Sequence, residues 1–195
     1  MEEFNDTDIK IINATFSILQ KEGVTKATTK KIAEKAGVNE VTIFRKFKNK
    51  NHLVEVTKEY YLKILFNKLE EVFDFNEEDT IEKYLQSNFI GLLNLPDEEF
   101  SVFKIAMEEV RDIPEKKQLI SRITNVIIDK LDEFFKFKIE KGEIRELDSR
   151  VLALVCFSVT FQSVVLLKVY DENPNINPDY YANSFLDILY NGIKG

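Results

Sequence analysis

The sequence predicts an all-α protein with two helical domains. Only 6 Gly and 4 Pro occur among the 195 residues, whereas an all-β fold needs many tight turns. Hydrophobic residues make up 44% of the chain and charged residues 31%, a composition typical of globular rather than disordered proteins. Apolar residues also recur at helical spacing along most of the chain. We expect an N-terminal three-helix domain over residues 1–50, joined by a fourth helix to a larger domain over residues 51–195, with about nine helices altogether.

Charge is distributed unevenly along the chain, whose net charge is −7. Residues 24–50 contain eight Lys or Arg residues and two Glu residues, a local balance of +6, so the remainder carries −13. A basic patch on an acidic body orients a protein toward phosphate groups, because one end is attracted and the other is repelled. The pattern therefore favours a nucleic-acid partner for the N-terminal segment.

The composition also bears on the cellular compartment. Cys156 is the single cysteine, which excludes an intramolecular disulfide framework, and residues 1–6 are acidic and polar, unlike a secretory signal. The longest uncharged run, residues 151–167, is slightly short for a bilayer and contains polar residues such as Ser158. We expect this run to be a buried helix of a soluble, cytoplasmic protein without a membrane partner.

The first helix is predicted to begin at Asp6 or Thr7, either of which can cap it, and to end at Gly23. Its apolar residues recur at helical spacing on one face: Ile9, Ile12, Phe16 and Leu19. This face predicts a core helix that braces the elements after it.

Residues 28–47 have the pattern of a helix-turn-helix motif, in which two short helices are separated by a turn at Gly37. Thr28 or Thr29 can cap the first helix and Asn39 the second, and Gly37 can adopt the left-handed conformation of the turn. Such a motif places its second helix in the major groove of DNA. We therefore expect double-stranded DNA to be a partner of this segment.

Three lysines stand at predicted helix starts, where the helix dipole disfavours positive charge. Lys30 and Lys31 follow the cap of the first short helix, and Lys50 follows Asn49, which can cap the fourth helix. A phosphate group at either helix end would receive backbone N–H groups and lysine charge together. A solvated lysine face is the alternative for Lys30 and Lys31.

The second short helix has an inner face formed by Ile43 and Phe47, four residues apart. Its other side chains are expected to face solvent or DNA: Asn39, Glu40, Val41, Thr42, Arg45 and Lys46. Asn can contact adenine edges, Arg guanine edges and Glu the cytosine amino group, while the methyl groups of Val and Thr can contact thymine. All six are candidates for base contact.

These motifs resemble the DNA-binding domain of the TetR/AcrR family of one-component regulators, over residues 6 to 60. The matching positions are Thr28-Thr29, Ile32-Ala33, Ala36-Gly37-Val38-Asn39, Thr42-Ile43-Phe44, Phe47-Lys48-Asn49-Lys50 and Leu53. Val41 stands where the family usually has Gly, and Phe44 where it usually has Tyr. We expect Phe44 to act by packing and close approach to the DNA backbone, because it lacks the tyrosine hydroxyl. The resemblance implies a transcriptional regulator and, by family habit, a repressor.

Beyond residue 50 the predicted helices are long. The fourth extends to about residue 73, and further helices are expected over residues 81–95, 97–110, 114–141, 149–170 and 178–193. Asp148 can cap the helix over 149–170, which is apolar nearly all round, and Asn177 can cap the amphipathic last helix. An apolar helix followed by an amphipathic one suits a two-fold four-helix interface. The resemblance implies the same homodimer through the last two helices, and a monomeric core is the alternative.

The second domain is rich in aromatic residues, and the resemblance implies that its helices enclose a small-molecule pocket. The candidate pocket residues are Phe66, Phe89, Phe103, Met107, Phe134, Phe161 and Gln162. We expect a small apolar or aromatic effector that shifts the fourth helix and releases the dimer from a palindromic operator. Aromatics at helical spacing can instead form a filled core. The alternative function is then a DNA-binding dimer controlled by a partner protein or by its abundance.

Other function classes receive less support from the residues. His52 and Cys156 lie in different halves of the chain and form no nucleophile–base pair, so we expect neither catalysis nor a cofactor. His52 has no second His and no Cys nearby in the sequence, so no metal site is predicted. A helical adaptor that contacts protein through its helix-turn-helix is a further alternative, against which the positive balance of residues 24–50 argues.

Overall fold

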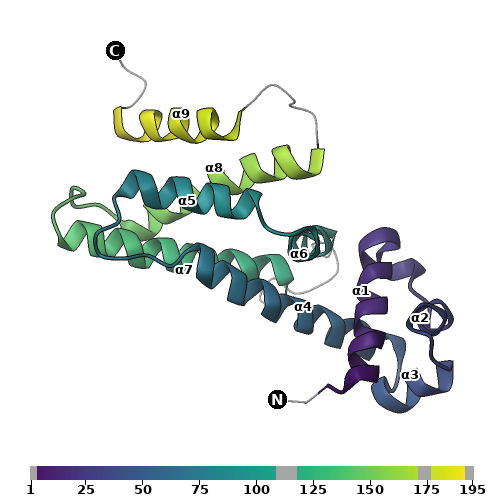
Figure 1. The fold of residues 1–195 in the computed structure, drawn as a ribbon. Coiled ribbons are helices and arrows are strands. Elements are labelled where there is room, and N and C mark those ends of the chain that lie inside the picture. The colour runs from purple at the N-terminus through teal and green to yellow at the C-terminus, as the bar shows by residue number, and fades with distance from the viewer. Residues whose placement is uncertain (1–3, 109–117, 171–176, 192–195) are drawn as a thin grey trace. The chain divides into compact units, whose positions relative to one another are not determined.

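The computed structural model describes residues 4–108, 118–170 and 177–191. Within these ranges it contains nine α-helices, one short π-helix and no β-strand, which confirms the predicted all-α class (Figure 1). The chain divides into two compact units: unit 1 is residues 1–65 with 97–121, and unit 2 is residues 66–96 with 122–195. These boundaries differ from the division at residue 50, because α6 (Asp97–Glu108) packs with α1 (Asp6–Lys26).

Unit 1 is organised around α1, which packs against α2 (Thr29–Ala36) and α6. The cap of α1 is Asn5 rather than the predicted Asp6 or Thr7, because the Asn5 side chain accepts the backbone N–H groups of Thr7 and Asp8. The Asp8 carboxylate in turn accepts the Asn5 backbone N–H (3.1 Å), which completes a capping box. The predicted break at Gly23 is confirmed by its φ of 76°.

Two further elements are fixed to α1 by side chains. In α4 (Lys50–Val72), the ring of Tyr61 stacks on Phe16 with centroids 3.5 Å apart, and its hydroxyl donates to Asn13 Oδ1 (3.1 Å). In α6, Ser101 accepts a hydrogen bond from Gln20 Nε2 (2.6 Å). Burial raises the pKa of Tyr61 to about 12, so its hydroxyl remains a donor at neutral pH.

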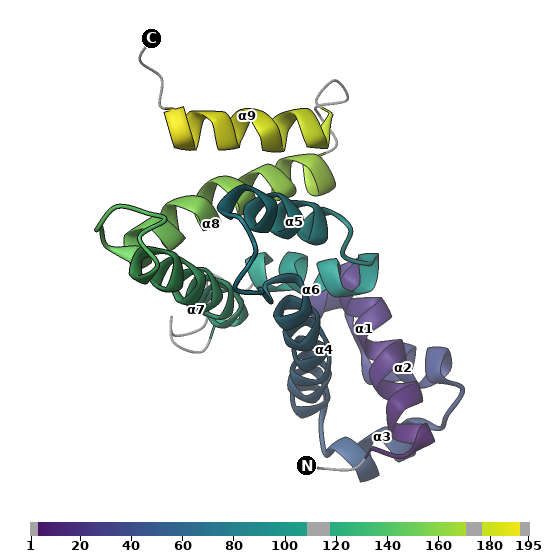
Figure 2. The ribbon, with the colours of Figure 1, turned by 60° about the vertical axis from the view of Figure 1, so that its left-hand side comes forward.

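Unit 2 contains the end of α4, α5 (Ile81–Leu93), most of α7 (Leu119–Glu140), α8 (Ser149–Val165) and α9 (Pro178–Asn191). The π-helix η3 (Leu166–Tyr170) continues α8. Figure 2 shows α9 along one side of α5 and α8, and α7 on the other side. Asn177 Oδ1 accepts the backbone N–H groups of Asp179 and Tyr180, which confirms the predicted start of α9. Residues 109–117 and 192–193 of the predicted helices lie outside the described residues.

Polar contacts join the helices of unit 2. The Ser149 hydroxyl at the start of α8 donates to Asp132 of α7 (2.5 Å), and Lys136 donates to the same carboxylate (2.8 Å). Burial of Asp132 acts to raise the pKa of its carboxyl, but these hydrogen bonds outweigh burial, so the pKa lies below the usual value. The Asn88 amide of α5, oriented with its nitrogen toward α4, donates to the carbonyl of Val72 (2.8 Å). Asn88 is therefore satisfied within the protein.

Candidate nucleic-acid interface and effector region

Helix α2 begins at the cap that the sequence predicts. The Thr28 hydroxyl accepts the backbone N–H of Lys31 (3.3 Å), and no acidic residue occupies the first turn of α2. Lys30 and Lys31 therefore stand at the positive end of the helix dipole without a carboxylate in that turn. Gly37 ends α2 with a φ of 67°, the left-handed conformation expected for the turn. The start of α2 is a favourable position for an anion such as phosphate.

Helix α3 (Glu40–Phe47) has the two faces expected from the sequence. Asn39 caps it by accepting the backbone N–H of Val41 (2.9 Å), and Ile43 and Phe47 are buried. The outer positions are exposed or half-buried: Asn39, Val41, Thr42, Phe44 and Arg45. Val41 is 70% exposed and Phe44 48% exposed. Large apolar side chains that face water on a recognition helix are available for contact with bases and sugars.

A hydrogen bond between Thr29 and Glu40 links the two short helices. The Thr29 hydroxyl donates to Glu40 Oε1 over 2.6 Å, and both residues are half-buried. The bond crosses the turn around Gly37 and holds the Glu40 carboxylate toward α2. Glu40 and Thr29 therefore fix the angle between α2 and α3 in addition to their predicted place near DNA.

Lys46 differs from the other predicted contact residues because its ammonium group is held inside unit 1. Its Nζ lies 2.7 Å from Asp8 Oδ1 and 3.3 Å from Asn5 Oδ1, at the capped start of α1. The side chains of Lys46 and Asp8 are only 20% and 13% exposed. The sequence signals that place Lys46 on α3 contain no information about this partner, since the two residues are far apart in the chain. Lys46 joins the recognition helix to α1.

The remaining predicted cations fall into two groups. Lys31 pairs with Glu22 (2.6 Å), a contact that also lowers the pKa of Glu22, and Lys50 Nζ lies 3.5 Å from the Val24 carbonyl oxygen. Both are surface contacts, which contribute little and exchange readily for a phosphate. Lys30 and Arg45 are exposed, and neither side chain has a hydrogen bond or ion pair with a described residue. Asn49 caps α4 as predicted by accepting the backbone N–H of His52 (2.9 Å).

The predicted pocket residues are distributed over both units. Phe103 and Met107 belong to α6 in unit 1, where the Phe103 ring lies 5.7 Å from Phe100, and the other five belong to unit 2. Three of these five are engaged by neighbouring aromatic rings: Phe89 with Tyr181 (5.6 Å), Phe134 with Tyr84 (3.8 Å) and Phe161 with Phe157 (5.2 Å). The guanidinium of Arg122 lies over the ring of Phe66, 6.0 Å from its centroid. Gln162 is exposed on α8. The seven residues therefore remain a prediction, with two of them in unit 1 and five in unit 2.

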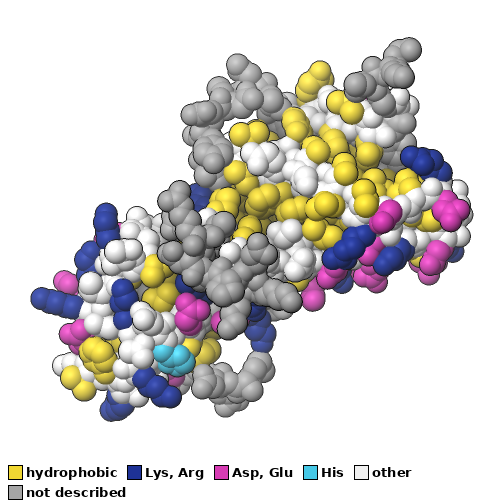
Figure 3. All heavy atoms as spheres, turned by 180° about the vertical axis from the view of Figure 1, so that it is seen from behind, with side chains coloured by type: hydrophobic (Ala, Val, Ile, Leu, Met, Phe, Trp, Pro, Cys, Tyr) yellow, Lys and Arg dark blue, Asp and Glu magenta, His cyan; other side chains and the backbone are white. Residues whose placement is uncertain are grey.

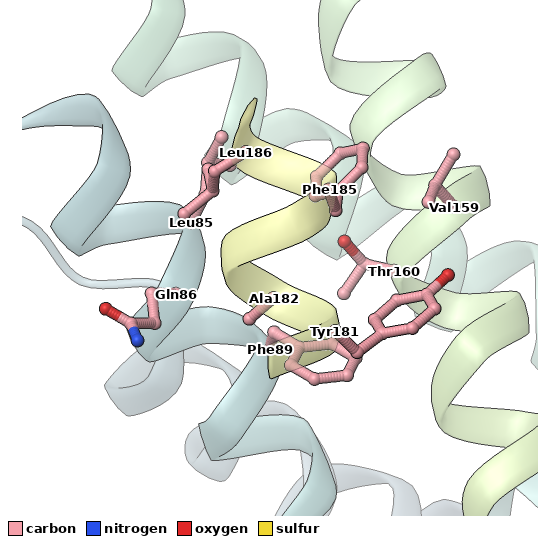
Figure 4. A pocket seen from close by; sticks show the side chains of 9 residues that line it. All are labelled: Leu85, Gln86, Phe89, Val159, Thr160, Tyr181, Ala182, Phe185 and Leu186. Atoms are coloured by element: carbon pink, nitrogen blue, oxygen red, sulfur yellow. The ribbon is translucent and has the colours of Figure 1, made fainter. Parts of the chain in front are cut away.

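Two small cavities lie inside unit 2. The first, of about 10 Å³, lies between α5, α8 and α9, and Figure 4 shows Thr160 and Phe185 directed into the space between α8 and α9. The second, also about 10 Å³, shares Leu85 and Thr160 with the first and extends to Cys156. Each has about the volume that one water needs, whereas ligand pockets measure roughly 300–1,000 Å³. Neither of these two cavities has room for a ligand in this conformation.

Hydroxyl and thiol groups lie in or beside the apolar walls of the two cavities. The hydroxyls of Ser163 and Tyr181 lie 2.5 Å apart and join α8 to α9 beside the first cavity. Burial raises the pKa of the Cys156 thiol to about 12, so the group is neutral there. Tyr181 and Phe185 also line the first cavity, although neither is among the predicted pocket residues.

Helices α8 and α9 expose a broad apolar surface, which Figure 3 shows as hydrophobic side chains gathered on one face of unit 2. Its large exposed members are Val151, Leu154, Val155, Leu166, Tyr180 and Ile188. Residues 149–168 are long and apolar enough to cross a membrane by length and composition alone, and only 28% of the most apolar part is buried. The expectation of a buried helix is therefore wrong for the single chain, because one face of α8 has no cover within the described residues.

Comparison with known proteins identifies the N-terminal segment. Residues 11–57 match the family model described as bacterial regulatory proteins, tetR family. A stretch of 49 residues is 55% identical to the uncharacterized HTH-type transcriptional regulator YvkB of Bacillus subtilis (strain 168), over 25% of this chain and 26% of that protein. Residues 11–57 therefore form a DNA-binding segment of the tetR type, and the fold of the whole chain is similar to that of TetR-family transcriptional regulators.

Two further comparisons cover nearly the whole chain. The fatty acid metabolism regulator protein of Bacillus subtilis (strain 168) is 26% identical over 192 residues, 95% of this chain and 94% of that protein. The crystal structure of FadR from Bacillus subtilis in complex with stearoyl-CoA superimposes with a TM-score of 0.68 at 25% identity, and covers 95% of this chain and 99% of that chain. TetR-family regulators bind DNA as dimers and are in general soluble cytoplasmic proteins. These relatives are regulators rather than enzymes, which supports the non-enzymatic class expected from the sequence.

Proposed function

We propose that this TetR-family chain is a repressor that binds a palindromic operator as a homodimer and is released by a small-molecule effector. The observation that carries the proposal is the outer surface of α2 and α3. Lys30 and Arg45 are exposed there without a partner among the described side chains, beside the exposed Val41 and Phe44. Exposed cations and exposed apolar groups on one helix-turn-helix suit simultaneous contact with phosphates and bases.

The proposed contacts divide among helices α2, α3 and α4 according to their geometry. The proposed phosphate contacts come from the starts of α2 and α4: Thr28, Lys30, Lys31 and Lys50. The proposed base contacts come from the outer face of α3: Asn39, Val41, Thr42 and Arg45. Phe44 approaches the sugar–phosphate backbone, while Thr29 with Glu40, and Lys46 with Asp8, hold α3 in place.

The second copy of the chain is proposed to pack on the exposed faces of α8 and α9. Val155, Tyr180 and Ile188 are about half or more exposed in the single chain, and a second identical surface would remove them from water. No charged residue lies between Val151 and Leu167, so two copies meet on this part without repulsion. A dimer presents two recognition helices to a palindrome, whose half-sites lie about one helical turn apart.

A long-chain acyl-CoA is the proposed effector class. The full-length relatives are fatty acid regulators, and one is bound to stearoyl-CoA. In this chain, the two cavities meet at Leu85 and Thr160, so together they mark an apolar seam through unit 2 from Phe185 to Cys156. An acyl chain that enters the seam must separate α8 and α9 from α5, because each cavity measures only about 10 Å³. The effector then shifts the protein between two conformations by its differential affinity for them.

Ring stacking inside unit 2 also favours the second candidate function, a DNA-binding dimer without an effector pocket. The stacked pairs Phe89–Tyr181 and Phe134–Tyr84 are what a permanent core would contain. Control would then come from a partner protein or from abundance. The two candidates share the DNA interface and differ only in the response to a ligand.

One experiment separates these candidates. Fluorescence anisotropy would follow binding to DNA from upstream of the chain's own gene, with and without stearoyl-CoA, free coenzyme A or stearate. Stearoyl-CoA is expected to release the protein from the DNA. It is also expected to stabilise the folded protein by about 2.7 kcal/mol when its concentration is one hundred times its dissociation constant, which raises the melting temperature. Tight DNA binding with no response to stearoyl-CoA would favour the dimer without a pocket. No salt-dependent DNA binding would contradict both.

A further inference from the structure

The exposed face of α8 has a polar centre. Its two ends are apolar and consist of Val151, Leu154, Val155 and Leu166. Ser158 and Gln162 are exposed between these ends. They lie seven and eleven residues after Val151, which places them on the same face of the helix. The surface that we propose to pair two copies of the chain therefore buries two polar side chains near its middle.

The two polar side chains differ in their hydrogen-bonding state. The Ser158 hydroxyl donates its hydrogen to the carbonyl of Leu154 (2.7 Å), so its oxygen can only accept a further bond. The Gln162 amide has two N–H donors and makes no side-chain hydrogen bond with a described residue. Burial of that amide against an apolar surface would leave its donors unsatisfied, which is unfavourable. Gln162 needs an acceptor, and Ser158 offers one.

We propose that the Gln162 amide of each copy donates to the Ser158 hydroxyl of the partner subunit, and that this pair of bonds sets the register of the dimer. The inference rests on the homodimer proposed above. Two copies of α8 that cross antiparallel about a two-fold axis midway between residues 158 and 162 bring Ser158 opposite Gln162. The same register brings Leu154 opposite Leu166, because both pairs are symmetric about the same point. Polar groups then meet polar groups, and apolar groups meet apolar groups.

Neighbouring registers match less well. An axis at Ser158 places Gln162 opposite Leu154, and an axis at Gln162 places Ser158 opposite Leu166. A parallel crossing places each residue opposite its own copy, so the two Ser158 oxygens face one another without a donor. One buried polar pair is known to specify register between helices at some cost in stability. With no charged residue between Val151 and Leu167, the amide and the hydroxyl carry this information on α8.

Disulfide cross-linking of the full-length protein tests the register. Ser158→Cys, carrying a size tag, is co-expressed with untagged Gln162→Cys, and the purified dimers are oxidised with copper–phenanthroline in air. A disulfide forms between two cysteines whose Cα atoms are about 4.4–6.8 Å apart. Residues 158 and 162 of opposite subunits are expected to approach this closely in the proposed register. Homodimers and heterodimers give bands of different mass on a non-reducing gel. Buried Cys156 is present in all variants, so the wild-type chain is the control for its contribution.

The proposal predicts several-fold more cross-linked heterodimer than either homodimer, and much less cross-linking for the matched pair Leu154→Cys with Gln162→Cys. Predominant homodimer bands, or efficient cross-linking of the Leu154 pair, would overturn the proposed register while leaving the dimer intact. Sedimentation velocity of the wild-type chain is run in parallel. A monomer at micromolar concentration would overturn the dimer itself, and with it both this inference and that part of the proposed function.

Discussion

The surface of α2 and α3 exposes cations, whereas the surface of α8 and α9 exposes large apolar side chains. Lys30 stands at the positive end of a helix dipole with no acidic residue in that turn, and Tyr180 is 72% exposed. Neither arrangement stabilises a single chain in water. The first surface lacks negative charge and the second lacks apolar cover. The difference indicates two partners of opposite chemistry, a polyanion and a second apolar surface.

The two surfaces also differ in the side-chain contacts that hold their residues in position. Specific polar contacts hold the surface of α2 and α3 in position, such as those between Thr29 and Glu40 and between Lys46 and Asp8. Along the apolar face of α8 the side chains are mostly uncharged hydrocarbon, and Ser158 is hydrogen-bonded within its own helix. A change on the DNA surface should therefore alter specific contacts, and a change on the apolar surface should alter assembly.

The largest effect is expected from Val155→Asp, which places a carboxylate in the proposed interface of each subunit. Burial of unpaired charges costs several kcal/mol per ion, so the dimer should dissociate, and operator affinity should fall by at least about 100-fold. Sedimentation velocity and anisotropy measure the two effects. Ile64→Asp is the matched control, because Ile64 is an exposed apolar residue of α4 in unit 1. A dimeric Val155→Asp protein would exclude this part of α8 from the interface.

The double change Lys30→Ala with Lys31→Ala should have the next largest effect. If both lysines contact phosphate, the slope of log affinity against log salt concentration becomes shallower by roughly 1.8, because each contact contributes about 0.9. Anisotropy titrations at several salt concentrations give this slope. Lys83→Ala removes an exposed lysine from unit 2 and should leave the slope unchanged. An unaltered slope for the double variant would show that the two lysines are a solvated face only.

Lys46→Ala is expected to weaken DNA binding without a change in the salt slope, because its ammonium is bound to Asp8 rather than available to phosphate. Loss of this partly buried contact should cost about 1–2 kcal/mol of stability, visible as a lower melting temperature. Adding Asp8→Asn to Lys46→Ala should cost less than the sum of the two single changes. A slope that falls as for a phosphate contact would indicate that Lys46 leaves Asp8 when DNA binds.

The smallest effect is expected from a matched pair of glycine substitutions. Gly37 and Gly142 both have left-handed φ, 67° and 75°, and a Cβ at either would have no atom within 4 Å. Gly37→Ala and Gly142→Ala should therefore each cost about 1–2 kcal/mol through backbone strain alone. Thermal denaturation should give similar losses, and only Gly37→Ala should weaken DNA binding, because Gly37 joins α2 to α3. Equal binding by both variants would show that the angle of this turn is not critical.

Local features of the fold could be predicted from the sequence because they depend on neighbouring residues. Thr28, Asn39, Asn49 and Asp148 cap helices as predicted, and Gly37 has the predicted conformation. In each case the side chain bonds to a backbone group within three residues of itself. The first cap was misplaced by one residue, since Asn5 competes with Asp6 and Thr7 for the same donors.

Features that depend on distant residues could not be predicted in the same way. Lys46 was expected to face solvent or DNA, but its partner Asp8 lies on another helix, and no local pattern links the two. The resemblance made Phe103 and Gln162 pocket candidates, but helical periodicity alone cannot tell which cluster an aromatic side chain joins or which face of an apolar helix is covered. The contacts of α6 with α1 and the exposed face of α8 decide these points.

If two copies of the chain pair through the apolar face of α8 and α9, as proposed, the control of genes depends on the dose of the protein. Below its dissociation constant, a pair of identical chains forms in proportion to the square of the chain concentration. If the operator binds only the dimer, its occupancy rises with the square of the chain concentration. Halving the chain concentration then lowers the occupancy up to about fourfold. Dilution by cell growth would thus act as a threshold on the regulated genes, alongside any effector.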